Sequence, residues 1–323
     1  MANDSDVQTC LVCEGATEPL HRAAGDYYFR SGQRADYVVC TDARCRTVHQ
    51  SPRPDAARIA TFYDGYYTHA HLPRLKRLEK TAGGHLQAIL LRGDRDAARC
   101  APVHAVRLAT GNVVLDVAGI VPGGPRPSIL DVGCGNGESL VMLAALGYAT
   151  QKGVEYDERA CEAARSLGFE VRPGTAESIP YDDESFDVVF VRHVIEHVLD
   201  PARAIAEALR VLRPGGLLSL LTPNAAARMH ERYGAYWRGL ECPRHLQLFT
   251  PDSLARLVAR AGATVLRQGA SDRSAHHMEK VSRACAAEHR GDGASSERFF
   301  DVAPEVQRGE EIYLIARRPE VRA

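Results

Sequence analysis

The stretch ILDVGCGNGESL, residues 129–140, decides the fold. An apolar run ends at Asp131, three glycines follow at positions 133, 135 and 137, and a helical pattern of apolar residues begins at Leu140. Glycine lets a ligand approach the backbone more closely than a Cβ allows, and it adopts turn dihedral angles that strain other residues. A strand, this turn and a helix in succession predict a site for a nucleotide-type ligand.

The spacing of the glycines distinguishes between two ligands. Tight strand-to-helix turns of many α/β proteins contain glycine, so the turn alone does not decide. The dinucleotide fingerprint places its third glycine one residue later, as GxGxxG, whereas this chain has GxGxG after an aspartate. The spacing therefore favours S-adenosylmethionine (SAM) over NAD, and a dehydrogenase is the less favoured alternative.

Later segments continue the α/β pattern. A short apolar strand ends at Glu155, 24 residues beyond Asp131, where a doubly wound sheet places the carboxylate that accepts the ribose hydroxyls of a nucleotide. Residues 186–191 (FDVVFV) are typical of a fully buried strand, and RPGG at 213–216 separates a helix from the next strand. This alternation predicts a doubly wound, mainly parallel sheet.

Four segments together are more specific: ILDVGCGNGESL, GVEYDERA, GTAESIPYDDESFDVVFVRHVIEHVLDP and LRPGGLLSLLTPN. In order and spacing they resemble the class I SAM-dependent methyltransferases over about residues 127–270. The resemblance implies an α/β fold with a Rossmann-like, doubly wound, seven-stranded sheet whose last strand, predicted at 311–316, is antiparallel. Glu155 would hold the ribose of SAM. The full set of implied SAM-binding residues is Asp131, Gly133, Cys134, Gly135, Asn136, Gly137, Glu155, Tyr156, Ala176, Glu177 and Arg192.

Length and charge limit the classes of function. With 323 residues, 45% of them hydrophobic, the chain has room for one full-sized domain and a smaller one. A formal net charge of −1 gives no general attraction to nucleic acid or to an acidic membrane surface. No window of 18 apolar residues occurs and the N-terminus is acidic, so we expect neither a membrane span nor a secretory signal, and a cytoplasmic location.

Four of the nine cysteines fall near the N-terminus, as Cys10 and Cys13 and, after 26 further residues, Cys40 and Cys45. In a reducing compartment such pairs indicate metal binding or thiol chemistry rather than disulfides. Each pair can form a tight turn around one tetrahedral ion, and the polar segment between them would need an ion for stability. We therefore predict a small structural zinc ribbon, against the alternative of four unrelated thiols.

The predicted domain organisation has three parts: a zinc-ribbon-like segment at 1–55, a helical cap at 56–125 and a SAM-binding methyltransferase domain at 126–323. A ribbon ahead of a SAM domain resembles bacterial methyltransferases of sugar and natural-product pathways. A cap of this kind would exclude water from the site. Tyr63, Tyr66 and Tyr67 either stack on an acceptor or pack the cap onto its neighbour, and packing is favoured.

The loop after the predicted strand at 186–191 carries His193, Glu196 and His197, and His245 follows further along the chain. If the loop begins a helical turn, the first three share one face. Similar stretches, Glu-x-x-Glu-His, bind a divalent ion in the metal-dependent small-RNA 2′-O-methyltransferases and the ubiquinone-pathway O-methyltransferases, although His193 stands where those enzymes have Glu. Extra imidazole would shift the preference from Mg²⁺ toward Mn²⁺, Fe²⁺ or Zn²⁺.

Two other roles for these four residues remain open. They either tie the loop together by hydrogen bonds, or His193 or His245 acts as a general base, since imidazole titrates near neutral pH. A nearby insertion at 233–240 contains Trp237 and Arg238. Trp237 either lines an acceptor pocket or anchors its loop, and Arg238 or Arg244 could hold an anionic group.

The sequence as a whole predicts SAM-dependent methyl transfer to a small-molecule acceptor, with a hydroxyl oxygen in a sugar or natural-product pathway favoured over nitrogen or carbon. Methylation of an RNA terminus is an alternative, but no basic patch supports nucleic acid as a partner. A non-catalytic alternative is a partner-binding ribbon beside a relic SAM domain. The oligomeric state is left open by the sequence.

Overall fold

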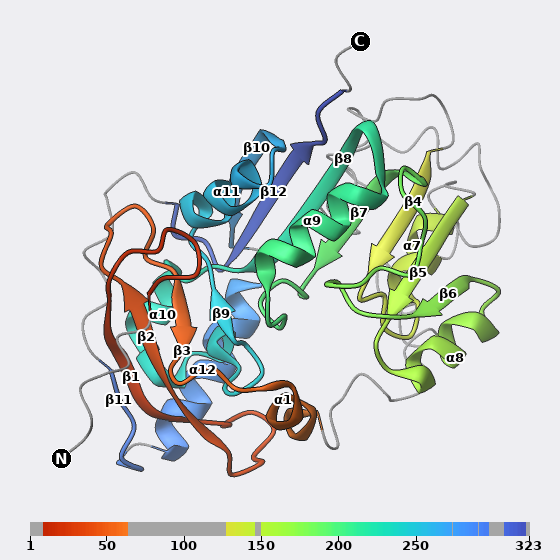
Figure 1. Ribbon diagram of the computed structural model, residues 1–323. Coiled ribbons are helices and arrows are strands. Elements are labelled where there is room, and N and C mark those ends of the chain that lie inside the picture. The colour runs from red at the N-terminus through yellow and green to blue at the C-terminus, as the bar shows by residue number, and fades with distance from the viewer. Residues whose placement is uncertain are drawn as a thin grey trace.

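The computed structural model describes residues 9–63, 127–145, 150–272, 274–289, 291–296 and 307–320. Within these ranges the chain forms a seven-stranded sheet and a five-stranded sheet, with helices packed against them (Figure 1). Most of the cap predicted at 56–125, including Tyr66 and Tyr67, lies outside the described residues. Its described part is the helix α1 (Ala56–Phe62), which begins at the N-cap Asp55.

The seven-stranded sheet confirms the predicted doubly wound, Rossmann-like fold. Its order is β10-β12-β8-β7-β4-β5-β6, with all pairs from β8 to β6 parallel and β12 antiparallel to both of its neighbours. The strands are β4 (Ser128–Val132), β5 (Thr150–Glu155), β6 (Glu170–Pro173), β7 (Phe186–Arg192), β8 (Leu212–Pro223), β10 (Thr264–Ser271) and β12 (Glu311–Arg317). The carboxyl ends of β4, β5 and β7 therefore meet at one edge, where ligands bind in such sheets.

Helices follow the strands as the sequence predicts, and their starts are fixed by local capping. Asp157, Asp200 and Thr250 each accept hydrogen bonds from the first turn of the helix that follows, and Thr250 with Ser253 forms a capping box. The three capped helices are α8 (Glu158–Ser166), α9 (Pro201–Val211) and α11 (Pro251–Arg260), whereas α7 (Glu138–Ala145) follows directly on the glycine-rich turn. Among the described residues, no helix has the length and apolar character that crossing a membrane requires.

The five-stranded sheet combines distant parts of the chain. Its order is β11-β1-β2-β3-β9, with every pair antiparallel (Figure 1). The strands are β1 (Thr17–Gly25), β2 (Arg34–Cys40), β3 (Val48–Gln50), β9 (Gln247–Leu248) and β11 (Ser295–Ser296). Two strands from beyond residue 240 thus complete the sheet of the predicted ribbon, and the boundary at residue 55 stays a prediction.

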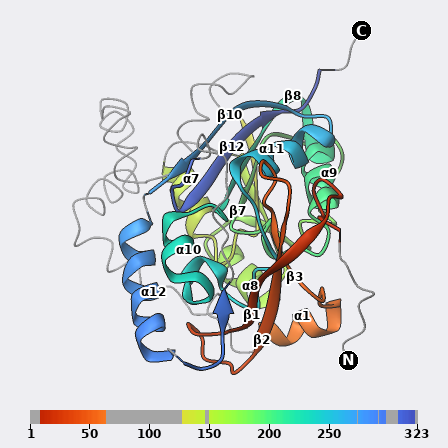
Figure 2. The ribbon, with the colours of Figure 1, turned by 90° about the vertical axis from the view of Figure 1, so that its left-hand side faces the viewer.

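The insertion and the segment that follows β10 both contain helical structure. The insertion at 233–240 forms two short 3-10 turns directly after α10 (Arg228–Tyr233), and residues 275–289 form α12 (Ala275–His289), which packs beside α10 (Figure 2). Trp237 is buried, donates its indole N–H to Glu310 Oε2 at 3.0 Å and stacks on His230. These contacts favour the anchoring role of Trp237 over the pocket role.

Candidate functional site

The glycine-rich turn at the end of β4 requires glycine at each position for a separate reason. Gly133, Gly135 and Gly137 have φ values of +71°, +55° and +88°, in the left-handed region that strains residues with a Cβ. A Cβ at Gly133 would overlap the side chain of Val194, and a Cβ at Gly137 would lie 3.0 Å from Ala164 Cβ of α8. A Cβ at Gly135 would meet nothing within 4 Å, so this face of the turn is open to a ligand.

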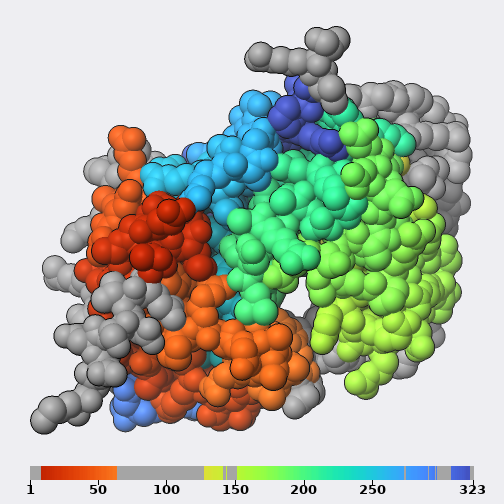
Figure 3. Space-filling model, viewed as in Figure 1, coloured from red at the N-terminus to blue at the C-terminus, as the bar shows by residue number. Residues whose placement is uncertain are grey.

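Glu155 lies next to Gly135 of this turn. Its Oε2 accepts a hydrogen bond from Gly135 N at 2.8 Å, and its Oε1 accepts from Tyr156 N at 2.8 Å and Asp157 N at 3.1 Å. The carboxylate is therefore fixed beside the open face of Gly135. Tyr156 follows with 72% of its surface exposed, and the surface of the molecule is hollowed between α1 and the region around α8 (Figure 3).

The other predicted SAM-binding residues occupy different positions around the turn. Asp131 is buried, accepts from Ser139 Oγ and forms an ion pair with Arg192, whose Nη2 lies 3.0 Å and 3.2 Å from its two carboxylate oxygens. Cys134 is buried, and burial raises the pKa of its thiol, whereas Asn136 is partly exposed. Asp131 and Arg192 thus neutralise each other behind the turn.

Ala176 and Glu177 follow β6, in the segment predicted to border the adenine. Ala176 is buried, with 5% of its surface exposed. Glu177 Oε1 accepts from Asp200 N at 2.7 Å, and the carbonyl oxygen of Glu177 accepts from Arg203 Nε at 2.8 Å. The side chain of Glu177 is therefore engaged with the start of α9, and contact with SAM stays a prediction for both residues.

The loop after β7 differs from the helical turn expected for it. His193 has a φ of +52°, and a tight turn with His197 N donating to Val194 O at 2.9 Å replaces the helix. His193 Nδ1 lies 3.3 Å from Glu196 Oε1 and its Nε2 lies 3.3 Å from Glu311 Oε1. Partial desolvation opposes the charge on the imidazole, but the two carboxylates outweigh it and raise the pKa of His193 above its usual value, although 47% of the side chain is exposed. His193 is therefore held as a cation between two carboxylates.

The other three residues of the predicted set come together. One oxygen or nitrogen atom each of Glu196, His197 and His245 lies within 4.8 Å of the others, a group that we call the histidine cluster. Glu196 is fully buried, accepts from Thr222 Oγ1 at 2.9 Å and lies 4.0 Å from His245 Nε2. Burial alone would raise the pKa of Glu196, but the ion pair with His193 and the neighbouring imidazoles lower it to about 2. Glu196 is an anion at neutral pH.

Backbone carbonyls orient both imidazoles of the histidine cluster. His197 Nδ1 lies 3.1 Å from Arg244 O, and His245 Nδ1 lies 2.8 Å from Gly239 O. Because a carbonyl oxygen only accepts, Nδ1 carries a proton in each ring, and Nε2 is the nitrogen that is left for another partner. Burial lowers the pKa of His245 to about 4, so this ring is neutral at pH 7.

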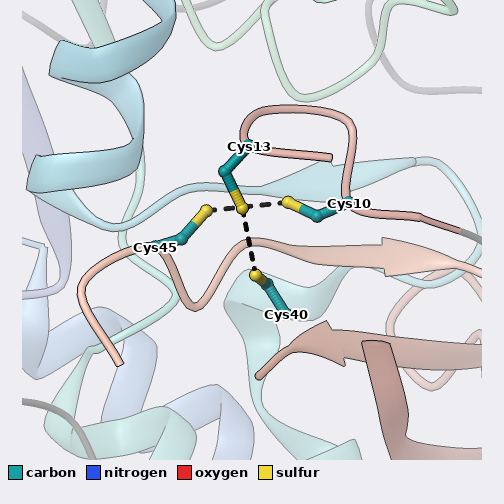
Figure 4. A group of neighbouring side chains, drawn as sticks. All are labelled: Cys10, Cys13, Cys40 and Cys45. Atoms are coloured by element: carbon teal, nitrogen blue, oxygen red, sulfur yellow. Dashed lines mark hydrogen bonds between the residues drawn. The ribbon is translucent and has the colours of Figure 1, made fainter. Parts of the chain in front are cut away.

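The four N-terminal cysteines also come together (Figure 4). The sulfur atoms of Cys10 and Cys45 are 3.6 Å apart, those of Cys13 and Cys40 are 3.4 Å apart, and Val12 N donates to Cys10 Sγ at 3.4 Å. Thiolates at about 2.3 Å from one tetrahedral zinc ion lie about 3.8 Å apart, so the arrangement fits that ion. The hydrogen bond between Cys10 and Cys45 lowers the pKa of Cys10 and raises that of Cys45, so that without an ion these two thiols share one proton.

Comparison with known families identifies the chain. The family model described as a methyltransferase domain matches residues 99–268, just over half of the sequence. The chain belongs to this methyltransferase family. Together with the seven-stranded sheet, the match makes it a class I SAM-dependent methyltransferase by family and fold.

Curated relatives of this methyltransferase share shorter stretches. The 27-O-demethylrifamycin SV methyltransferase of Amycolatopsis mediterranei is 33% identical, over 36% of this chain and 48% of its own length. A ubiquinone biosynthesis O-methyltransferase of Thiobacillus denitrificans is 32% identical, over 42% of this chain and 63% of its own. The eight relatives compared are matched over 34% to 63% of their own lengths.

A solved structure is also similar. A SAM-dependent methyltransferase of Thermotoga maritima, described as a possible histamine N-methyltransferase, is 24% identical, with a TM-score of 0.44 over 60% of this chain and 84% of that one.

The methyltransferase site includes residues that sequence reasoning did not select. The hydroxyl of Tyr63 lies 3.1 Å from His197 Nδ1, and Glu241 Oε2 lies 3.7 Å from His245 Nε2. Thr222 and Glu311, at the ends of β8 and β12, hold Glu196 and His193. A signal existed for Thr222 and Glu311, because Thr222 ends a predicted strand at the sheet edge where ligands bind and Glu311 begins the predicted antiparallel strand at the same edge. Tyr63 and Glu241 meet the cluster through tertiary packing alone.

Proposed function

We propose that this protein transfers the methyl group of SAM to a hydroxyl oxygen of a small molecule. The observation that carries the proposal is the histidine cluster, because Glu196 and His197 lie on the loop that packs against the glycine-rich turn through Val194 and Gly133. Donor site and proton-accepting groups are thereby adjacent. Two relatives whose names refer to rifamycin and to ubiquinone O-methylation support oxygen as the acceptor atom.

The proposed SAM site is the open face of the glycine-rich turn. Glu155 is placed to accept hydrogen bonds from the two ribose hydroxyls, because a carboxylate is an acceptor for such donors. The exposed Tyr156 and the buried Ala176 border the expected adenine position. The Asp131–Arg192 pair would stabilise the turn from behind, with SAM lying on the other side of the backbone.

Within the histidine cluster, we assign the proton-accepting role to His245 rather than to His193. As the acceptor oxygen bonds to the methyl carbon and the bond from that carbon to sulfur breaks, the hydroxyl proton must leave. Neutral His245 has a lone pair on Nε2, and Gly239 O fixes its ring. His193 is already protonated between Glu196 and Glu311, so it has no lone pair to offer.

The histidine cluster would also suit a divalent ion. Glu196, His197 and His245 would hold the ion, which when bound would lower the pKa of the acceptor hydroxyl. Metal-binding histidines commonly donate their second ring N–H to a carbonyl, as His197 and His245 do here. Two imidazoles and one carboxylate favour Mn²⁺, Fe²⁺ or Zn²⁺ over Mg²⁺. His193 is not part of this donor set.

We further propose that Cys10, Cys13, Cys40 and Cys45 bind a structural zinc ion. All four ligands come from protein, which leaves no open position for a substrate. Three of these cysteines are buried in a core that also contains Leu254 of α11, and Thr250 Oγ1 donates to Cys45 O at 2.9 Å. Such an ion would therefore stabilise the contact between the N-terminal segment and the larger sheet. The cytoplasmic location stays a prediction.

The test is methyl transfer from isotopically labelled SAM to a panel of catechols, hydroquinones and sugars, with metal-free protein and with added Mn²⁺. We expect a labelled methyl ether, and loss of at least a hundredfold in turnover for Glu196→Gln, His197→Ala and His245→Ala with SAM affinity nearly unchanged. His277→Ala, on the exposed face of α12, is the control. Unchanged turnover in the three variants would remove the histidine cluster from the mechanism.

A further inference from the structure

One ion pair links the histidine cluster to the five-stranded sheet, which we call the cysteine-bearing sheet because its strand β2 ends at Cys40. Arg244 directs Nη1 and Nη2 at the two carboxylate oxygens of Asp26, at distances of 3.0 Å and 2.8 Å. Asp26 lies in the turn between β1 and β2, 218 residues away in the sequence. The side chains of Asp26 and Arg244 are only 1% and 2% exposed, so solvent does not screen the pair.

The remaining contacts of Arg244 fix its guanidinium from several sides. Its Nη1 donates to Phe62 O, the last residue of α1, at 3.3 Å, and its Nε lies 3.3 Å from Glu241 Oε1. The ring of Phe29 covers the guanidinium with its centroid 4.2 Å from the central carbon. The carbonyl of Arg244 itself accepts from His197 Nδ1, so the side chain of Arg244 holds the peptide that orients His197.

Strands of the cysteine-bearing sheet also hold the next residue of this loop. Tyr37 of β2 donates its hydroxyl to His245 O at 3.1 Å. Gln50 of β3 donates to Tyr37 Oη at 3.1 Å and also to Pro243 O. The backbone on both sides of Arg244 is thus fastened to residues that precede α1, at the position where the loop presents the ring of His245.

A buried, bidentate pair restricts geometry more than an apolar contact would. The planar fork of arginine meets a carboxylate in a defined orientation, and removal of one partner leaves an uncompensated buried charge. Asp26 is fixed in turn, because it accepts from Phe29 N at 3.1 Å and from Ser31 Oγ at 2.6 Å. The orientation of the Asp26 carboxylate is therefore set within the β1–β2 turn, and the ion pair in turn fixes the orientation of the Arg244 guanidinium.

We propose that Asp26 and Arg244 are positioning residues through which the cysteine-bearing sheet sets the ring orientations of His197 and His245. The inference deepens the proposed function and rests on that function for the chemical role of the two rings. The orientation of the rings by Asp26 and Arg244 does not depend on the proposed function. The N-terminal segment is, in this account, a part of the acceptor site rather than an appended binding module.

The first readout is the nitrogen resonances of the histidine rings in the full-length protein labelled with ¹⁵N-histidine, at one fixed pH. For Asp26→Asn and for the double variant Asp26→Asn/Arg244→Gln, we expect the Nδ1–H signals of His197 and His245 to shift. The double variant removes both charges together, so it avoids the buried unpaired charge that could unfold a single variant. Unshifted ring resonances in the folded double variant would overturn the proposal.

The matched control is Arg34→Gln. Arg34 also ties the β1–β2 hairpin to the rest of the chain, through Asp292 at 3.0 Å, but it does not contact the loop of Arg244. We expect this variant to leave the histidine resonances in place. Equal shifts in Arg34→Gln and in Asp26→Asn would contradict the proposal, because they would show that any loosening of the hairpin has the same effect.

A second readout separates positioning from general destabilisation. Calorimetric titrations with SAM and with Mn²⁺ should show SAM affinity within about twofold of wild type and Mn²⁺ affinity at least tenfold weaker in the double variant. An equal loss of both affinities would point to a purely structural role and would overturn the proposal. If the wild type binds no Mn²⁺ and methylates no acceptor, the proposed function fails, whereas the ring resonances still decide on Asp26 and Arg244.

Discussion

Val194 fills the space in front of Gly133, so that the loop bearing Glu196 and His197 of the histidine cluster rests directly on the glycine-rich turn. The two segments leave neighbouring parallel strands, β4 and β7, whose carboxyl ends lie side by side. A change in the turn must therefore displace the loop. In a methyltransferase this contact would hold the donor site and the acceptor site at a fixed distance and orientation, which in-line transfer requires.

Gly133→Ala tests this contact. The new Cβ would overlap Val194 in addition to adopting a φ of +71°, whereas Gly168→Ala carries only the backbone penalty, since φ is +89° and nothing lies within 4 Å. We expect Gly133→Ala to cost at least about 1 kcal/mol more free energy of unfolding than Gly168→Ala. Urea denaturation of the two variants measures the difference, and equal losses would show that Val194 yields without cost.

Removal of one thiol tests the proposed zinc site. Cys13→Ser should reduce the zinc content from about one ion per chain to almost none and lower the melting temperature, because a tetrahedral site with three ligands binds zinc much more weakly. Cys161→Ser changes a buried thiol on α8 outside the group of four and serves as the control. Elemental analysis and thermal melts provide the measurement. Full zinc content in Cys13→Ser would contradict the assignment.

The buried pair of His21 and His230 predicts a loss of stability in acid. The two Nε2 atoms are 2.8 Å apart. Because His230 Nδ1 donates its proton to Ala225 O, His230 Nε2 accepts the hydrogen bond that His21 Nε2–H donates. Burial lowers the pKa of both rings, that of His230 to about 4. Since the unfolded chain binds protons below its pKa of about 6.5 and the folded chain does not, stability falls as the pH drops from 6.5 toward 4.

His230→Gln measures the contribution of this pair. We expect the free energy of unfolding of the wild type to fall by on the order of 2 kcal/mol more than that of the variant between pH 7 and pH 4.5. His277→Gln, an exposed position on α12, should follow the wild type. Parallel pH profiles for the wild type and His230→Gln would show that the pair does not titrate as its burial implies.

Local patterns predicted the fold well. The doubly wound sheet is confirmed, because apolar periodicity and glycine turns act within a few residues of one another, and so is the antiparallel last strand that the family resemblance implied. The four cysteines are close together as their spacing suggested. The condition that a helical turn begins at His193 is not met, because His193 has a left-handed φ and lies between two carboxylates.

Long-range pairs could not be predicted from the sequence. Asp26 and Arg244 are an ordinary turn residue and an ordinary loop residue, and only the folded chain brings them together across 218 positions. Tyr63 was judged a packing residue, yet its hydroxyl lies 3.1 Å from His197 Nδ1. Trp237 is the reverse case: its type suits an acceptor pocket, yet in the structure it is buried against Glu310 and His230. No short pattern encodes such choices.

Calorimetric titration with SAM, repeated with NADH, tests the central claim most directly. The account predicts saturable one-to-one SAM binding, no NADH signal, and at least tenfold weaker SAM binding for Glu155→Ala, because the carboxylate at the open face of Gly135 is lost. Glu158→Ala, an exposed change on the neighbouring helix, should bind as the wild type does. No SAM binding by folded, ligand-free protein, or binding that is indifferent to Glu155→Ala, would contradict the account.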